Sequence, residues 1–336
     1  MSALIDLRDP SSFPSRREEV WKYTDVRRLL REAPPPSPAG DAAPGGPFAS
    51  LGGEEVAVVN GRGADRIVVT GEATRRLRFV STSDGTGHQA TVAIEVAPGA
   101  SLLLLESHEG QAAGYVANAR LTITLGEGAI CTRLVLGEDA ADALSFVRTE
   151  VALAPGATFH QTTVTTGAKL QRFETHVRHP GQGASVQLDG LYALTGERHA
   201  DLTSVVTHAG RDGLTSQLTK GSVRDTARGV FQGKIVVERG ADGTDARMGH
   251  HALILSERGE VDAKPELIIY ADEVQCAHGN TIGALDEQAL FYMQSRGLPA
   301  DEARALLTQA FLMEVVDRID HEGTREVVRA WPTERL

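Results

Sequence analysis

Cys276 and His278 have the residue types and the spacing that metal chemistry needs. They lie two positions apart in the sequence QCAHGN, at the end of a strand-like run. Because alternate residues of a strand face the same side, the thiol and the imidazole could serve one site. A thiolate and a neutral imidazole suit iron or zinc, and cysteine is the usual ligand of iron–sulfur clusters. Cys131 is the one other cysteine, so the thiols of this chain cannot complete such a site alone.

A structural role for the same pair is the alternative. Cys276 would then be a small buried hydrophobic residue beside a hydrogen-bonded histidine, and the spacing by itself favours this interpretation. The position of the pair, just before a helical segment, favours function, because strand ends and the turns after them often carry it. We therefore treat His278 and Cys276 as candidate iron or cluster ligands whose ligand set a partner completes.

Cys131 and the adjacent histidines His250 and His251 carry weaker signals. Neighbouring residues on a strand point to opposite faces, so we expect one histidine packed and one facing solvent rather than a joint metal site. Cys131 follows a glycine turn and is expected in the core, with a ligand role as the minor alternative.

The composition bounds the class of protein. The chain has 336 residues and a formal net charge of −11, which disfavours binding to nucleic acid or to anionic membranes. No apolar run is long enough to span a bilayer, and the N-terminal sequence has no apolar signal core. Two cysteines do not make a disulfide framework, so we expect a reducing, cytoplasmic location.

Sequence motifs of common enzymes are absent. The chain has no G-x-x-x-x-G-K-[ST] loop, no G-x-S-x-G elbow and no H-E-x-x-H pair, and no two carboxylates stand out as a glycosidase dyad. We therefore expect no catalytic residues and no tightly bound cofactor in the isolated chain.

A repeat organises the middle of the chain. Alternating apolar residues, a Gly-Ala turn and a second alternating run recur around Gly99, Gly128, Gly156 and Gly183, which are spaced by 29, 28 and 27 residues. One strand–turn–strand unit per repeat is typical of a β-solenoid, in which stacking buries the apolar face that a single unit leaves open. An antiparallel sandwich or barrel is the alternative that the same turns allow.

The flanking segments have different character. Residues 15–31 predict a short amphipathic helix, either continuous or broken near Thr24–Asp25, and residues 33–50 are a mobile linker rich in proline and glycine. After Asp286 the apolar spacing predicts a helical hairpin that caps the β body, with Gly297 ending its first helix and a strand or coil from 321 onward. The predicted organisation is 1–32 helical, 33–50 linker, 51–285 β-helix core and 286–336 helical.

Several motifs together resemble the SufB/SufD family of iron–sulfur cluster assembly proteins. The resemblance covers most of the chain and is closest to the SufD branch. Its residues are Glu18–Thr24 (EVWKYT preceded by Glu), Phe231–Ile235 (FQGKI), Thr244–Ala246 (TDA), 264–267 (KPEL), 270–272 (YAD), Val274, 276–279 (CAHG), 291–292 (FY) and 295–297 (SRG). The chain departs from the family pattern at Ala277 and Asn280, where serine and alanine are usual, and at Met248, His250 and Ala252, where glutamine and asparagines are usual.

The resemblance implies a right-handed parallel β-helix flanked by helical segments. It also implies a non-enzymatic subunit that pairs with a SufB-like chain and binds a SufC-like ABC ATPase through 286–319. A transient iron–sulfur cluster would form at the SufB–SufD interface, where His278 corresponds to the histidine implicated in SufD, and Cys276 would assist. Homodimers could compete with the heterodimer. Two other hypotheses are a polysaccharide-active β-helix enzyme and a purely structural partner of SufB that never contacts the cluster.

Overall fold

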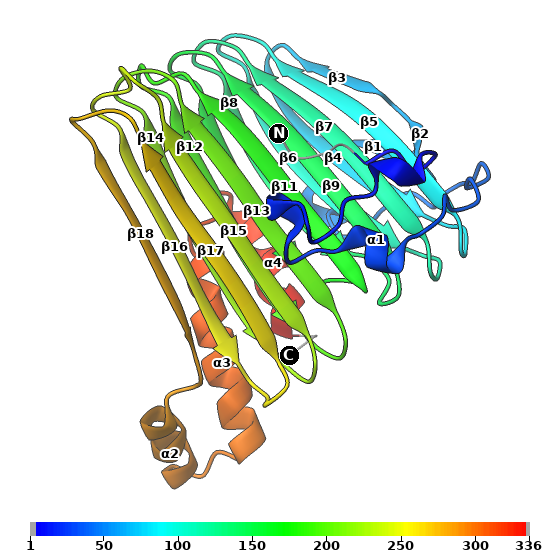
Figure 1. The fold of residues 1–336 in the computed structure, drawn as a ribbon, viewed down its shortest axis with the longest axis vertical. Coiled ribbons are helices and arrows are strands. Elements are labelled where there is room, and N and C mark those ends of the chain that lie inside the picture. Colours follow the sequence, from blue (N-terminus) through cyan, green and yellow to red (C-terminus); the bar gives the residue numbers. More distant parts are fainter. Residues whose placement is uncertain (1–4, 334–336) are drawn as a thin grey trace.

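The computed structural model describes residues 5–333, and the body of the protein is a parallel β-helix (Figure 1). Its even-numbered strands, joined by β1, form a 10-stranded sheet in the order β18-β16-β14-β12-β10-β8-β6-β4-β1-β2. The other odd-numbered strands form an 8-stranded sheet in the order β17-β15-β13-β11-β9-β7-β5-β3. All pairs except β1–β2 are parallel, as in the pairing of β10 with β12. The predicted solenoid is therefore confirmed, and the antiparallel sandwich is excluded.

The strands run through most of the chain, and from β4 onward all but three have ten residues. Their bounds are β1 Glu54–Val59, β2 Arg62–Gly63, β3 Arg66–Val69, β4 Glu72–Ser81, β5 Gly87–Val96, β6 Ser101–Gly110, β7 Val116–Leu125, β8 Ile130–Glu138, β9 Leu144–Leu153, β10 Thr158–Thr165, β11 Leu170–His179, β12 Ser185–Leu194, β13 His199–His208, β14 Leu214–Val223, β15 Arg228–Val237, β16 Asp245–Ile254, β17 Glu260–Ile269 and β18 Gln275–Gly283.

Helical elements precede and follow the β-helix in the sequence. The α-helices are α1 Val26–Leu29, α2 Glu287–Ser295, α3 Ala300–Val316 and α4 Glu322–Thr333, and the 3₁₀ helices are η1 Pro10–Ser12, η2 Glu19–Trp21 and η3 Ala49–Leu51. None of the helices in the described part of the chain is both long and apolar enough to cross a membrane.

The glycines of the sequence repeat form one row of stacked turns. Gly99, Gly128, Gly156 and Gly183 all have positive φ, between 62° and 76°, which residues with a Cβ rarely adopt. The Gly99 N–H donates to the Glu127 carbonyl of the next turn at 2.9 Å, and the Gly128 N–H donates to that of Pro155 at 3.1 Å. Hydrogen bonds between turns therefore continue the ladder of the sheets at this corner.

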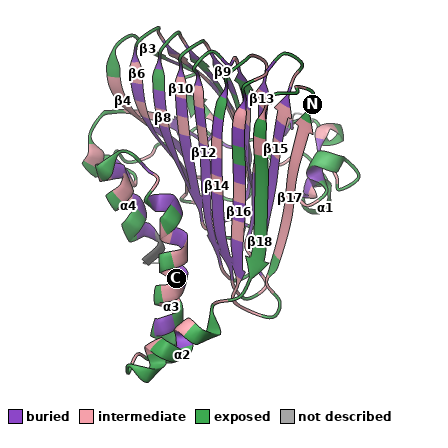
Figure 2. Ribbon diagram, turned by 90° about the vertical axis from the view of Figure 1, so that its left-hand side faces the viewer, coloured by how far each residue is buried: buried purple, intermediate pink, exposed green. Residues whose placement is uncertain are grey.

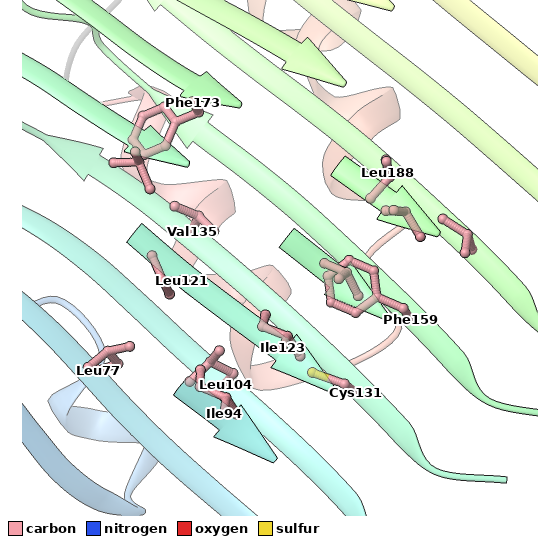
Figure 3. Packing of buried hydrophobic residues seen from close by; sticks show 14 of the residues in the cluster. Leu77, Ile94, Leu104, Leu121, Ile123, Cys131, Val135, Phe159, Phe173 and Leu188 are labelled. Atoms are coloured by element: carbon pink, nitrogen blue, oxygen red, sulfur yellow. The ribbon is translucent and has the colours of Figure 1, made fainter. Parts of the chain in front are cut away.

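Side chains that point into the lumen of the β-helix form its main core (Figure 3). Leu104, Leu121 and Ile123 are completely or almost completely buried there, and Cys131 has no exposed surface. Burial raises the pKa of the Cys131 thiol to about 12, so the thiol stays protonated. The expectation that Cys131 belongs to the core is confirmed.

The lumen also holds charge. Arg133 lies 2.8 Å from Glu106, and the carboxylate of Glu106 contacts the His108 ring at 2.8 Å. Burial by itself would raise the pKa of Glu106, but Arg133 and His108 hold it below its ordinary value. This buried ion pair has no signature in the sequence repeat.

The N-terminal segment crosses the outer face of the eight-stranded sheet (Figure 1). In place of a continuous amphipathic helix it has the two short helices η2 and α1, with the break at Thr24–Asp25 that the sequence allows. Asp25 caps α1 by accepting a hydrogen bond from the Arg28 N–H at 3.2 Å, and Thr24 is buried against Asp201. The break lets both Trp21 and Val26 reach the sheet, where they are buried.

Residues after α1 also contact the body. Pro36 pairs with Gly87 in an isolated bridge, and the Ser37 N–H donates to the Gly87 carbonyl at 2.9 Å. Residues 36 and 37 are therefore held against the start of β5.

The C-terminal helices pack on the outer face of the ten-stranded sheet (Figure 2). Leu312, Val315 and Val316 of α3 share a buried cluster with outward-facing leucines such as Leu134 and Leu191. Gly297, with φ of 94°, follows α2 as predicted. The prediction that the helices cap the end of the solenoid is wrong, because these outward leucines give α3 an apolar surface along the side of the sheet.

The end of the chain differs from its prediction as well. A strand or coil was expected from 321 onward, but α4 occupies Glu322–Thr333, because Val328 and Trp331 lie one turn apart and both bury against the body. Residues 1–4 and 334–336, which belong to the two predicted helical segments, lie outside the described residues.

Candidate functional site

The last coil forms an open end of the β-helix. β18 pairs with β16 on one side and is the terminal strand of its sheet, and β17 is the terminal strand of the other sheet. Almost all of β18 is exposed, whereas half of the residues of β16 are buried and β17 is mostly of intermediate exposure (Figure 2). The described residues therefore leave the lumen and one edge of each sheet uncovered at this end.

Cys276 and His278 lie on the lumen side of that last strand. In the parallel register Cys276 is opposite Ala246, and His278 is opposite Met248. Ala246 and Met248 are 0% and 3% exposed and share a buried cluster with Phe231 and Ile235 of β15 in the facing sheet, which identifies their side of the sheet as the inner one. The alternation of the strand thus places the thiol and the imidazole on the same face, at the mouth of the lumen.

The two side chains differ in their environment. His278 is exposed, whereas Cys276 is half-buried and packs against the cluster that contains Met248. Burial raises the pKa of the Cys276 thiol, opposed by a hydrogen bond with the backbone of Ala246. A metal bound there would have to displace the thiol proton, because the thiolate is the ligand.

A complete metal site does not exist within this chain as described. Over residues 5–333, no group of three or more His, Cys, Asp or Glu side chains is arranged to hold a metal ion. Clusters are commonly held by four protein ligands, and this end offers one thiol and one free imidazole. The donor set fits half of a shared site.

His250 and His251 occupy opposite faces of β16, as predicted. His250 is fully buried, and His251 is partly exposed with its Nδ1 atom 2.7 Å from the Thr281 hydroxyl. The structure brings His250 into contact with Asn280 of β18, at 2.7 Å between Nδ1 and Oδ1. Sequence reasoning missed this contact, although both residues were already visible as departures from the family pattern.

A second concave region lies where the C-terminal helices leave the body. It has a volume of about 630 Å³ and separates the last coils from the α2–α3 hairpin. Its lining is Arg224, Ile254, Leu255, Ala284, Leu285, Glu287, Leu290, Asp301, Arg304, Ala305 and Thr308. On α2 itself, Phe291 and Tyr292 are 74% and 59% exposed, which leaves aromatic surface on the outside of this helix.

Comparison with known proteins gives a consistent result. A family model described as "SUF system FeS cluster assembly, SufBD core domain" matches residues 79–311. An iron–sulfur cluster assembly SufBD family protein of Synechocystis sp. is 34% identical over 205 residues, which are 61% of this chain and 45% of that protein. The iron–sulfur cluster assembly protein SufD of Escherichia coli is 29% identical over 244 residues, which are 72% of this chain and 58% of that protein.

A longer match is found in Mycobacterium leprae. There an iron–sulfur cluster assembly SufBD family protein is 27% identical over an alignment of 361 positions, covering 95% of this chain and 89% of that protein. The chain spans about half the length of the Synechocystis and Escherichia coli relatives.

Proposed function

This chain belongs to the SufB/SufD family of iron–sulfur cluster assembly proteins, and we propose that it is a SufD-like scaffold subunit that shares a cluster assembly site with a SufB-like partner. It performs no catalysis of its own in this proposal. Its contribution is a shaped surface with His278 as ligand and Cys276 as a second or assisting ligand. The cluster is the cargo of the complex and is held only transiently.

The observation that carries the proposal is the open end of the β-helix. Terminal strands present unpaired backbone N–H and C=O groups, and soluble proteins normally protect such edges. At this end Ile269, Tyr270 and Ile282 are 41%, 61% and 41% exposed, which adds apolar surface around the lumen mouth. A second β-helix that docks there would cover the edges and bury the apolar groups in one step.

The ligand count supports a partner of the same family. One chain supplies Cys276 and His278 on adjacent inward positions of β18. A SufB-like chain that meets this end would add the missing thiolates opposite them. The pairing would also exclude water from the half-exposed thiol, so that cluster formation and subunit association support each other.

The C-terminal helices are proposed to bind the SufC-like ATPase. In the α2–α3 hairpin of 286–319, α2 and the start of α3 extend beyond the body (Figure 1), and the exposed Phe291, Tyr292 and Leu306 form apolar surface suited to a protein partner. Because α3 also packs on the body, movement of the hairpin during ATP hydrolysis would shift the balance between closed and open interfaces.

The experiment is reconstitution of the three-subunit complex with His278→Ala and, separately, Cys276→Ala. Cluster formation is followed by visible absorption and by iron and sulfide content, and complex assembly is measured by size-exclusion chromatography. We expect His278→Ala to abolish or strongly reduce cluster formation while the complex still assembles. His251→Ala is the matched control, because His251 is on the neighbouring strand but faces outward. Undiminished cluster formation by His278→Ala would refute the proposed ligand role.

The same exposed edges fit a second copy of this chain. We propose that a homodimer competes with the heterodimer for the open end. Sedimentation of the chain alone and after addition of the SufB-like subunit would measure this: the homodimer should decline as the heterodimer forms.

A further inference from the structure

A chain of three hydrogen-bonded side chains runs from the interior of the β-helix to its open end. The Tyr192 hydroxyl lies 3.0 Å from Nε2 of His250, and Nδ1 of His250 lies 2.7 Å from Oδ1 of Asn280. Tyr192 and His250 are fully buried, whereas Asn280 is exposed on the lumen side of β18. The three residues belong to strands β12, β16 and β18 of the ten-stranded sheet, in which β16 and β18 are neighbours and β14 separates β12 from β16.

The two buried rings are held in place by their surroundings. The imidazole of His250 is stacked on Phe231 with 4.7 Å between ring centres and 1° between planes. Tyr192 fills space that two glycines leave: a Cβ atom on Gly221 would lie 1.9 Å from its ring, and one on Gly229 would lie 2.5 Å away. Neither ring can turn without displacing a neighbour.

The orientation of the Asn280 amide, with Oδ1 toward His250, sets the direction of these hydrogen bonds. Burial lowers the pKa of His250 to about 4, so its ring is neutral near pH 7 and carries one N–H. Oδ1 of Asn280 can only accept, so the proton is on Nδ1, and Nε2 accepts from the Tyr192 hydroxyl. Each hydrogen bond therefore points outward, and the NH₂ group of Asn280 lies on the side of the amide away from His250.

Among the described residues, no group accepts a hydrogen bond from this NH₂ group, so it can donate to a bound ligand. Asn280 is two positions beyond His278 on the same face of β18, at a spacing of about 7 Å along the strand. Both ring nitrogens of His250 are already engaged, so His250 is not itself a metal ligand. The donor next to the candidate ligand is Asn280.

We propose that Asn280 donates a hydrogen bond to an anionic sulfur, a sulfide or thiolate of the cluster assembled beside His278, and that Tyr192 and His250 are positioning residues that orient its amide. The identity of the acceptor rests on the proposed function. Hydrogen bonds to sulfur raise the reduction potential of a cluster and stabilise it, and partners outside the ligand sphere control ligand geometry.

The orientation is tested on the chain alone, without iron or partner. Long-range ¹H–¹⁵N NMR at pH 7 reads the tautomer of each histidine ring, and His250 is expected as the neutral Nδ1–H form. In Asn280→Ala, which removes the acceptor of the Nδ1–H bond, this preference should give way to a mixture of tautomers, because Nε2–H can then donate to the Tyr192 hydroxyl. If His250 of the unaltered protein were in the Nε2–H form, the hydrogen bonds would run in the opposite direction, and a doubly protonated ring would break one of them. Either result would overturn the positioning role.

The donor role is tested in the reconstituted complex with Asn280→Ala and Asn280→Asp. At equal iron and sulfide loading, both should shift the midpoint potential of the cluster to more negative values and shorten its lifetime several-fold. Thr281→Ala, next in sequence but on the outer face, should match the unaltered complex. Unchanged potential and lifetime in both Asn280 variants would overturn the donor role.

The outcomes separate this inference from the proposed function. If His278→Ala abolishes the cluster and Asn280→Ala leaves its properties unchanged, only the inference fails. If the His278→Ala complex also assembles a normal cluster, the proposed function is refuted, and so is the proposed hydrogen bond from Asn280 to a cluster sulfur. The NMR result decides the positioning role in either case.

Discussion

The guanidinium carbon of Arg172 lies 4.2 Å from the centre of the Trp21 ring, although the two residues are far apart in the sequence. Arg172 is almost fully buried on the outer face of β11, where it also pairs with Glu174 at 3.0 Å and Asp201 at 2.7 Å. The indole therefore covers a buried ionic group from the solvent side and attaches the N-terminal segment to the β-helix.

We expect Trp21→Ala to lower the free energy of unfolding by about 3–5 kcal/mol, the usual cost of removing a large buried aromatic side chain. The loss has a second cause, because the variant exposes one side of the Arg172 ion pairs to water. Urea unfolding followed by circular dichroism measures it. Val20→Ala is the control, since Val20 is 37% exposed, and should change stability by less than about 0.5 kcal/mol. Equal stability of the two variants would show that the segment is not attached through Trp21.

The stacked pair His179 and His208 predicts loss of stability in mild acid. Their ring centres are 4.5 Å apart, and burial lowers the pKa of both, that of His208 to about 3. Each ring is therefore neutral in the folded chain at pH values where the unfolded chain, with an ordinary histidine pKa near 6.5, already binds a proton. The unfolded state binds more protons between about pH 6.5 and pH 3, so stability falls as pH falls through this window.

The contribution of one ring can be isolated with His208→Gln, which retains a hydrogen-bonding partner for Thr215. Between pH 6 and pH 4 the unfolding free energy of this variant should depend on pH less steeply, by up to about 1.4 kcal/mol per pH unit for one proton. Unfolding in urea at several pH values gives both slopes. Parallel slopes would mean that His208 titrates normally in the folded chain.

The two thiols should react with very different rates. Cys276 is half-buried at the open end, whereas Cys131 lies within the lumen with no exposed surface. An aromatic disulfide reagent should modify one thiol of the native chain and the second only after unfolding in denaturant. Cys276→Ser should abolish the native reaction, and Cys131→Ser should leave it unchanged. Native modification of Cys131 would show that the lumen opens on the timescale of the experiment.

The close contact between Gly221 and Tyr192 predicts that a larger residue at position 221 lowers the stability of the protein. An added Cβ would lie 1.9 Å from the phenol ring, inside a packed lumen where neither group can move away. Gly221→Ala should therefore destabilise the chain by roughly 1–3 kcal/mol or more, measured as a lower midpoint in urea. Gly279→Ala is the matched control on β18, because no atom lies within 4 Å of the Cβ position there. A stable Gly221→Ala variant would require a different position for Tyr192.

The sequence predicted the β-helix but not how the terminal segments pack on its outer faces. Glycine turns and alternating strands depend on local backbone geometry, which a single chain segment displays. The side-on packing of α3 depends on outward leucines such as Leu105 and Leu134, which lie in runs that are apolar on both faces. Such a run indicates that both faces of the strand are buried.

The candidate site was predicted in part for the same reason. The common face of Cys276 and His278 follows from strand alternation alone, whereas their roles as ligands remain proposals. The contact between His250 and Asn280 requires the register between β16 and β18, which one sequence does not determine. The ion pair of Glu106 and Arg133 also depends on strand register, because the two residues lie on consecutive turns of the β-helix and meet only when β6 and β8 are aligned.

The constant register of the coils makes the length of this protein adjustable. Phe159 is level with Cys131 before it and with Val186 after it, and the same row continues through Thr215 and Ala246 to Cys276. Removal or duplication of one whole coil would bring equivalent rows together again, with both sheets still paired. The body can therefore be lengthened or shortened between the N-terminal segment and the last strand without a change of sequence at either end.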